Sequence, residues 1–372
     1  MAQYGGLGGL GGLGGLGGLG GLGGLGGLGG LGGLGAQTGL GGFLGAGDVG
    51  GYSGAATAGL MTTADGLRHL AGNAVAPDPA PLAFDDPSNL NRWAQWVRGS
   101  LYISEVFPAL TFSTDPAAQT VTLDFDGAPM VTLARPSDAL LADQIEFVSN
   151  YADLRPDRAS EIASQLGFPT EYFAMILGLH VGQHPKTFEL LMAVQVMAAH
   201  AAMIVKHALA VRRPDQIDGR ILPMIPTPGH GSFPSAHATE AYTALTVLEG
   251  LVGAWGSLGD MAPRLAILRG LAERIAVNRT VAGVHYPIDS WAGAALGTAL
   301  GRALLGRCGQ APAALPSLSY TAQNSDFNDH DFTQNAAAHG LTEGPAYSAA
   351  AAPNFTWLWD LAAAEHQAPA GV

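Results

Sequence analysis

The chain has 372 residues, of which 48% are hydrophobic, and its formal net charge is −13. A chain of this length can bury a sizeable hydrophobic core in one or two domains. The strong negative charge argues against a surface that binds nucleic acid or an anionic membrane. The single cysteine, Cys308, cannot form an internal disulfide bond, so nothing in the sequence requires an oxidising compartment.

Residues 1 to about 58 form a low-complexity segment in which Gly-Gly-Leu repeats place a leucine at every third position from 7 to 34. This spacing forms neither a helical nor a strand face, and glycine loses much backbone entropy on ordering. We therefore predict a disordered, largely passive tail. The segment lacks the basic start and continuous apolar core of a signal peptide, so the compartment is undetermined and a soluble, cytoplasmic protein is the default expectation.

The remaining residues, 59–372, have the composition of one folded domain. Segments 119–125 and 130–134 alternate threonine and valine with other residues around a turn at 126–129, which predicts a small β-hairpin. Beyond the hairpin, the spacing of apolar residues predicts helices at 137–155, 157–166, 170–179, 187–212, 235–252, 263–277 and 287–305. We therefore expect an all-α helical bundle with a minor β-hairpin.

The helix expected at 187–212 contains an apolar run, 188–205, that is about long enough to span a bilayer. That run also holds Glu189, Gln195 and His200, which are costly inside a membrane. These polar residues favour a core helix of a soluble bundle, so the sequence predicts no membrane span.

Lys206 and Arg213 lie seven residues apart, which is close to two helical turns. Both side chains should therefore project from one face of a helix that Pro214 ends. Two cations on one face repel each other unless an anion lies between them. The alternative is a solvated basic helix end that favours the negative pole of the helix dipole.

Residues 234–237 read Pro-Ser-Ala-His and follow a loop, 226–231, that is rich in glycine and proline. They are expected to open a helix, whose first N–H groups lack intrahelical partners and can bind an anion. Ser235 adds a hydroxyl donor, and His237 adds a group that can transfer a proton near neutral pH. The alternative is a plain serine cap with a surface histidine.

His285 and Asp289 are separated by a helix start, because Pro287 suits the first turn of a helix. The carboxylate can accept a hydrogen bond from one ring nitrogen, which fixes the tautomer and leaves the other nitrogen as a nucleophile or a metal ligand. Arg279, on the preceding segment, can supply a bidentate fork for the oxygens of an oxyanion. The alternative is a His–Asp pair with a purely structural role.

Taken together, the three motifs resemble those of the superfamily of type 2 phosphatidic acid phosphatases (PAP2) and vanadium-dependent haloperoxidases, over about residues 187–305. The spacings of Lys-x6-Arg-Pro, Pro-Ser-Gly-His and Ser-Arg-x5-His-x3-Asp all match. Ala236 replaces the glycine and Asn278 the serine of that pattern, which puts the backbone geometry beside the oxyanion in question. The resemblance implies a helical bundle that holds phosphate or vanadate with Lys206, Arg213, Arg279, Ser235 and the N–H of Ala236.

The resemblance also implies roles for the remaining residues. In the phosphatases, the match to His285 attacks phosphorus, the match to Asp289 orients it, and the match to His237 protonates the leaving group. In the haloperoxidases, the match to His285 coordinates vanadium and the match to His237 assists peroxide activation. His230 lies where algal bromoperoxidases carry a second active-site histidine, although a plain loop histidine is the alternative.

His230, the resemblance of residues 226–239 and 281–287 to the soluble haloperoxidases, and the prediction of a soluble bundle favour a vanadate-dependent haloperoxidase. Such an enzyme uses hydrogen peroxide to oxidise a halide, here bromide rather than chloride, with Lys206 polarising the peroxide. The first alternative is a soluble acid phosphatase that hydrolyses phosphomonoesters through a phosphohistidine on His285 and needs no cofactor. The second is a catalytically impaired binding or structural relative. Trp357 and Trp359 are expected to pack a terminal segment onto the bundle or onto a second subunit of a homodimer.

Overall fold

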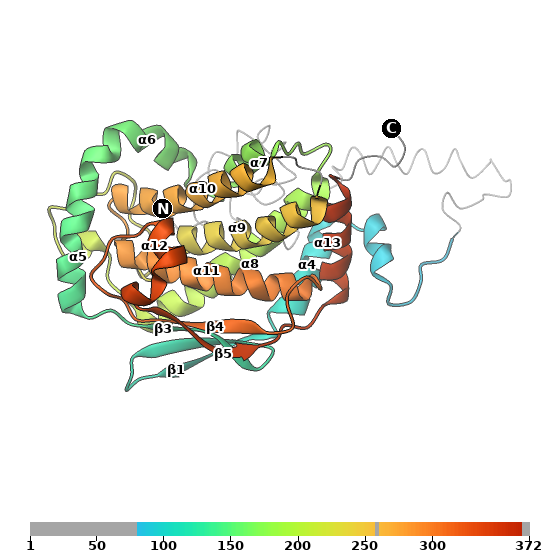
Figure 1. Cartoon of the computed structure of the whole chain (residues 1–372), viewed down its shortest axis with the longest axis horizontal. Coiled ribbons are helices and arrows are strands. Elements are labelled where there is room, and N and C mark those ends of the chain that lie inside the picture. Colours follow the sequence, from blue (N-terminus) through green and yellow to red (C-terminus); the bar gives the residue numbers. More distant parts are fainter. Residues whose placement is uncertain (1–79, 257–259, 367–372) are drawn as a thin grey trace, which may run out of the picture.

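The computed structural model describes residues 80–256 and 260–366, and the Gly-Gly-Leu repeat predicted as a disordered tail lies outside them (Figure 1). Figure 1 shows a layer of helices on one side of a sheet. The layer contains α8 (Pro185–Leu209), α9 (Ala236–Trp255), α10 (Met261–Val281) and α11 (Pro287–Arg307). At one end stand α4 (Gln95–Val106) and α13 (Pro353–Ala364), and at the other α5 (Asp138–Tyr151) and α6 (Arg155–Ser164). The remaining helices are α7 (Thr170–Leu177) and α12 (Asp329–Gln334), with short 3-10 turns at η3 (Pro87–Arg92), η4 (Ala152–Leu154), η5 (Pro214–Gln216) and η6 (Ala336–His339).

The sheet has five strands in the order β1-β2-β3-β4-β5. They are β1 (Leu110–Asp115), β2 (Thr120–Phe125), β3 (Ala128–Ala134), β4 (Leu315–Tyr320) and β5 (Leu341–Tyr347). Neighbouring strands are antiparallel except β3 and β4, which are parallel. The expectation of an all-α fold with a minor hairpin was therefore wrong, because the predicted hairpin, β2 with β3, is the first part of a larger mixed sheet.

The missed strands lack the local pattern on which the sequence prediction relied. In β1, apolar and polar residues alternate only from Leu110 to Ser113, which is a short signal, and Leu110 alone is buried. In β4, Pro316 interrupts a run that would otherwise read as a strand. One partner of β4 is β3, far upstream in the chain, where Val131 pairs with Leu318. Such a long-range pairing leaves no signal in a short window of sequence.

Glycines on α11 bring it close to α9 along their length. A Cβ added at Gly293 would lie 2.6 Å from the carbonyl oxygen of Ser235, and one at Gly297 would lie closer still to that of Thr239. Gly301 continues the same face, since residues four apart lie one above the other on a helix. Because the first turns of both helices carry site residues, this contact fixes those residues relative to each other.

α8 is buried along most of its length, and its one internal carboxylate, Glu189, is paired. Glu189 accepts hydrogen bonds from Arg98 at 2.6 Å and from Tyr102 at 2.8 Å. Within residues 80–256 and 260–366, one helical stretch, Pro185–Gln216, is long and apolar enough to cross a membrane. It contains an 18-residue segment with a mean hydropathy of 1.8, and 83% of that segment is buried inside the protein. The prediction of no membrane span is corrected to this extent: the stretch passes as a candidate span by length and composition, because its few polar residues do not lower the mean hydropathy enough.

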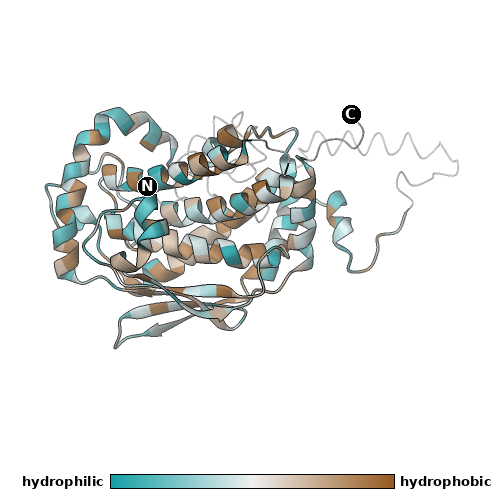
Figure 2. Cartoon of the chain, viewed as in Figure 1, coloured by the Kyte–Doolittle hydropathy of each residue, from teal (hydrophilic) through white to brown (hydrophobic). Residues whose placement is uncertain are grey.

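Hydropathy differs between the centre of the helical layer and its end. Figure 2 shows mostly hydrophilic residues on α6 and a mixture of hydrophilic and hydrophobic residues on α5, whereas α9 carries few hydrophilic ones. At the other end, Trp359 of α13 is buried, and Nζ of Lys186 lies 4.6 Å from the ring centre of Trp357. Both tryptophans therefore have partners within the chain, which is the first of the two arrangements expected for them.

Candidate active site

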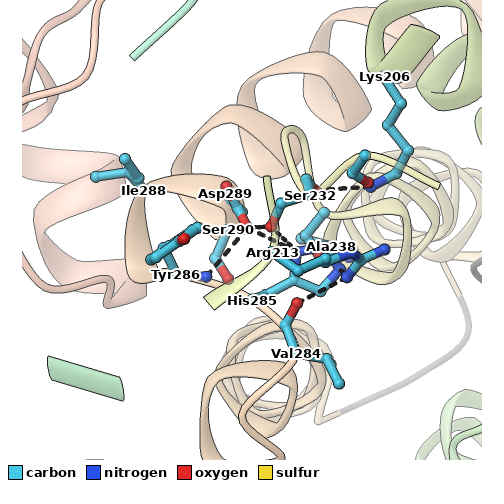
Figure 3. Close-up of polar contacts among 12 residues, drawn as sticks. Lys206, Arg213, Ser232, Ala238, Val284, His285, Tyr286, Ile288, Asp289 and Ser290 are labelled. Carbon is cyan, nitrogen blue, oxygen red and sulfur yellow. Dashed lines mark hydrogen bonds and ion pairs between the residues drawn. The ribbon is translucent and has the colours of Figure 1, made fainter. Parts of the chain in front are cut away.

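The residues singled out in the sequence come together where α9 and α11 begin and α8 ends (Figure 3). Lys206 lies in the last turn of α8, and its side chain is buried. Its Nζ donates to the carbonyl oxygens of Gly231 at 2.9 Å and Ser232 at 2.7 Å. Burial, and then Arg213, hold the pKa of Lys206 well below its ordinary value. A bound anion would raise that pKa again, because an opposite charge favours the charged form.

Arg213 follows α8 after a turn in which Ala210 adopts a positive φ of 47° and ends the helix. Its NH1 group donates to the carbonyl oxygen of Val284 at 2.7 Å and to Nε2 of His285 at 2.9 Å (Figure 3). Its Nε donates to the carbonyl oxygen of His230 at 3.1 Å. Burial lowers the pKa of Arg213 to about 10, so the guanidinium stays charged at neutral pH.

The tautomer of His285 follows from these contacts. Arginine is only a donor, so Nε2 of His285 must carry a lone pair, and the ring proton lies on Nδ1. Nδ1 lies 2.7 Å from Oδ2 of Asp289, which also accepts from the N–H of Tyr286 at 3.0 Å. Burial, and then Arg213 and Lys206, hold the pKa of His285 well below its ordinary value. The imidazole is therefore neutral near pH 7, with its unprotonated nitrogen beside a guanidinium.

Ser232 is a site residue that the sequence interpretation missed. Its hydroxyl donates to Oδ2 of Asp289 and lies 3.5 Å from Nδ1 of His285. Burial raises the pKa of Asp289 to about 6, and the hydrogen bond from Ser232 opposes that rise. The serine therefore favours the carboxylate form that holds His285. No spacing in the sequence links Ser232 to Asp289, so only the fold could reveal the pair.

Ser235 caps α9, and Ala236 is the first residue of that helix. The hydroxyl oxygen of Ser235 accepts from the N–H of Ala238 at 3.3 Å, and the N–H of Ser235 donates to the carbonyl oxygen of Asp289 at 2.8 Å. The hydroxyl proton of Ser235 remains available to a ligand. Ala236 takes the right-handed helical conformation, which alanine adopts without strain. The residue that replaces the glycine of the family pattern therefore fits the backbone.

His237 and Arg279 lie together at the C-terminal end of α6. Nε2 of His237 lies 2.8 Å from the carbonyl oxygen of Gln165, and since a carbonyl only accepts, Nε2 carries the ring proton. Arg279 contacts the carbonyl oxygens of Ile162 at 3.4 Å and Gln165 at 3.5 Å. Burial, and then Arg279, hold the pKa of His237 well below its ordinary value, and burial lowers the pKa of Arg279 to about 10. In the part of the chain that the structure describes, Nε of Arg279 has no partner.

His230 contacts the guanidinium of Arg213. Its Nδ1 is 3.1 Å from NH2 of Arg213 and 3.1 Å from the carbonyl oxygen of Gly231, and it can bond only one of the two. Burial, followed by Lys206 and Arg213, lowers the pKa of His230 to about 3, so the ring is neutral. The structure thus brings His230 next to a cation of the site, at NH2 of Arg213, whereas NH1 of the same guanidinium contacts His285.

Three buried cations, Lys206, Arg213 and Arg279, act on the neutral ring of His237, and the first two also act on that of His285. Such a group of cations beside the start of a helix is the chemistry that binds a tetrahedral oxyanion. The PAP2 superfamily matches residues 188–307, and this part of the chain is a PAP2 superfamily domain. Among similar proteins are the decaprenylphosphoryl-5-phosphoribose phosphatases of Mycobacterium tuberculosis and Mycolicibacterium smegmatis. The first is 38% identical over 104 residues, which are 28% of this chain and 51% of the relative. The second is 37% identical over 93 residues, which are 25% of this chain and 44% of the relative.

The chain thus spans about half the length of the curated relatives it matches. Both relatives are named phosphatases, which corrects the leading prediction from the sequence. Vanadate as a cofactor, with hydrogen peroxide and halide as partners, is not supported, whereas the phosphatase alternative is. The sequence did not separate the two functions, because phosphate and vanadate are both tetrahedral oxyanions that the same cations can hold. The preference for a haloperoxidase rested on His230, on the resemblance of residues 226–239 and 281–287 to the soluble haloperoxidases, and on the prediction of a soluble bundle.

Proposed function

We propose that this chain is a phosphatase that hydrolyses a phosphate monoester, without a cofactor, through a phosphorylated His285. The observation that carries the proposal is the state of this side chain: Nδ1–H donates to Asp289, and the lone pair on Nε2 faces Arg213. An imidazole held in one tautomer by a carboxylate is an activated nucleophile. The easy fit of Ala236 into the helix start argues against an impaired relative.

The three cations supply the binding energy for the phosphate. Lys206, Arg213 and Arg279 are each oriented by backbone carbonyl oxygens. Carbonyl groups fix the direction of a cation but carry no net charge, so they do not cancel its attraction for a phosphate oxygen. Donors oriented in advance in a buried site stabilise the charge that develops in the transition state at little cost of reorganisation. Ser235 and the N–H groups at the start of α9 would add hydrogen bonds to the same oxygens.

The proposed reaction has two steps. In the first, Nε2 of His285 attacks phosphorus, a P–N bond forms, the P–O bond to the leaving group breaks, and His237 gives its second proton to the leaving oxygen. Asp289 stabilises the positive ring of the phosphorylated His285. In the second, water attacks phosphorus and gives a proton to His237, the P–N bond breaks, and phosphate leaves with His285 restored.

The first test is release of phosphate from two aryl esters by the full chain, p-nitrophenyl phosphate with a good leaving group and phenyl phosphate with a poor one. We expect both to be hydrolysed without added metal or vanadate. Failure to release phosphate from either ester, by protein that unfolds cooperatively on heating, would contradict the proposal.

The pH dependence of kcat/KM tests the two histidines. The lowered pKa of His237 means that its doubly protonated form, the acid for the leaving group, is populated in the free enzyme only below the ordinary histidine value. We therefore expect kcat/KM for phenyl phosphate to rise as pH falls from about 8 to about 6, until protonation of His285 reverses the trend. His237→Gln should remove most of this rise, and should slow p-nitrophenyl phosphate less, because its leaving group needs less protonation. A profile for phenyl phosphate that is flat to about pH 9 would rule out His237 as the acid.

A further inference from the structure

Gln165, which ends α6, connects two of the residues on which the proposed reaction depends. Its side chain is fully buried. Oε1 of Gln165 accepts from Nδ2 of Asn278 at 2.9 Å and from NH2 of Arg279 at 3.3 Å, and its Nε2 donates to Glu161 at 3.2 Å. Its backbone carbonyl accepts from Nε2 of His237 at 2.8 Å. One residue thus contacts both a cation and the general acid of the proposed mechanism.

The hydrogen bonds to Arg279 orient the guanidinium and come from groups without a full charge, while the carboxylates of Glu240 and Glu161 lie near enough to favour its charged form. Besides Oε1 of Gln165, its partners are the carbonyl oxygens of Gln165 and Ile162 at the C-terminal end of α6. That end carries the negative pole of the helix dipole, which attracts a cation without holding a full charge. The three distances, 3.3 to 3.5 Å, are long for hydrogen bonds, and Nε has no partner among the residues described. The guanidinium of Arg279 is therefore held in one orientation and can still donate hydrogen bonds to a ligand.

Asn278 completes the arrangement at the position where the family pattern has serine. Its Nδ2 donates to Oε1 of Gln165 and to Oε1 of Glu161, both at 2.9 Å. Its Oδ1 accepts from Arg158 at 3.1 Å. A serine has one hydroxyl proton and a shorter side chain, so it could not make these bonds together. The asparagine thus holds the Gln165 amide with its oxygen towards Arg279.

We propose that Gln165 and Asn278 are positioning residues for phosphate binding at this site. The side chain of Gln165, held by Asn278, directs Arg279 towards the phosphate, and the carbonyl of Gln165 holds Nε2–H of His237. Nδ1 of His237 is then the nitrogen that gains and loses the second proton. This inference rests on the proposed function and adds two residues that act through their neighbours rather than by touching the substrate.

Gln165→Leu removes Oε1 but keeps the carbonyl that contacts His237. We expect KM for p-nitrophenyl phosphate and Kd for inorganic phosphate, measured by calorimetry, each to rise about tenfold, the usual scale for a lost hydrogen bond to a charged group. The expected change in kcat is below about threefold, and the rise of kcat/KM at low pH should persist. Gln165→Met, which is unbranched and closer in shape to glutamine, repeats the test if the leucine variant does not fold.

The matched control is Gln195→Leu in α8. Gln195 is also fully buried, and its Oε1 accepts from Thr170 at 2.8 Å, with no contact to the site. This variant should lower the melting temperature and leave KM and the phosphate Kd unchanged. A purely structural role for Gln165 would give the same pattern in both variants.

A double-mutant cycle tests whether Asn278 acts through Gln165 or independently of it. If Asn278 acts through Gln165, Asn278→Ser should raise the phosphate Kd, and the double variant should raise it no further than the larger single effect. If the two substitutions raise the phosphate Kd by factors that multiply in the double variant, Asn278 acts independently of Gln165 and the proposed link between them is wrong.

The outcomes for the inference and for the proposed function are distinct. If the unaltered protein hydrolyses both esters and Gln165→Leu leaves KM and Kd unchanged, the inference fails and the function stands. If it binds phosphate but hydrolyses neither ester, the function fails and the Kd series alone decides the inference. If it neither binds nor hydrolyses, both fail.

Discussion

Replacing His285 with alanine is expected to reduce hydrolysis of aryl phosphates by a factor of about 10,000 or more, the scale seen when a catalytic nucleophile is removed. The reason is that no other neutral imidazole among the described residues has both a carboxylate on one nitrogen and a guanidinium at the other. Binding of inorganic phosphate should persist, because Lys206, Arg213 and Arg279 remain. The measurements are kcat for p-nitrophenyl phosphate and Kd for phosphate.

The control for this variant is His200→Leu in α8. His200 stacks on Phe107 with ring centres 4.3 Å apart and has no contact with the site, so its loss should leave kcat unchanged. Rapid acid-free quenching with labelled substrate should trap phosphate on the unaltered chain in an acid-labile, base-stable form, as expected for a P–N bond, and not on His285→Ala. Activity of His285→Ala within about tenfold of the unaltered protein would place the nucleophile elsewhere.

Replacing Gly297 with alanine is expected to destabilise the fold by about 3 kcal/mol, the upper range for overpacking in a core. The added Cβ would collide with the carbonyl oxygen of Thr239 and lie 3.0 Å from the N–H nitrogen of Thr243, and these backbone atoms of α9 cannot move aside alone. Separation of α9 from α11 would also shift Ser235 away from Asp289, so phosphatase activity should fall together with the free energy of unfolding. Urea unfolding followed by circular dichroism measures the change.

Gly270→Ala in α10 is the matched control, because a Cβ at Gly270 would meet nothing within 4 Å. Alanine in an exposed helix interior is more favourable than glycine by up to about 1 kcal/mol, so this variant should be neutral or slightly more stable. If Gly297→Ala matched it, the close approach of the two helices would not be a determinant of stability.

The sequence predicted the helices well where apolar spacing was regular, and the three motifs did meet in space. It failed where a residue's role depends on a distant partner. β4 is a strand because β3 lies beside it, and Ser232 bonds Asp289 because the loop before α9 folds back onto α11. Gln165 belongs to no sequence motif, and its contact with Arg279 follows only from the packing of the end of α6 against α10. Residues that suit both phosphate and vanadate could not distinguish the phosphatase alternative from the haloperoxidase prediction.

Several bonds that orient the cations are made by main-chain oxygens of one short loop, those of His230, Gly231 and Ser232. A substitution in this loop alters a side chain but leaves its carbonyl oxygen in the chain, whereas a deletion or insertion shifts every carbonyl after it. The loop should therefore tolerate almost no change of length. Two of its residues are also constrained in type, because the hydroxyl of Ser232 bonds Asp289 and a Cβ at Gly231 would lie 3.0 Å from the carbonyl oxygen of Lys206. In natural variants of this protein, a constant loop length would be the expected record of that constraint.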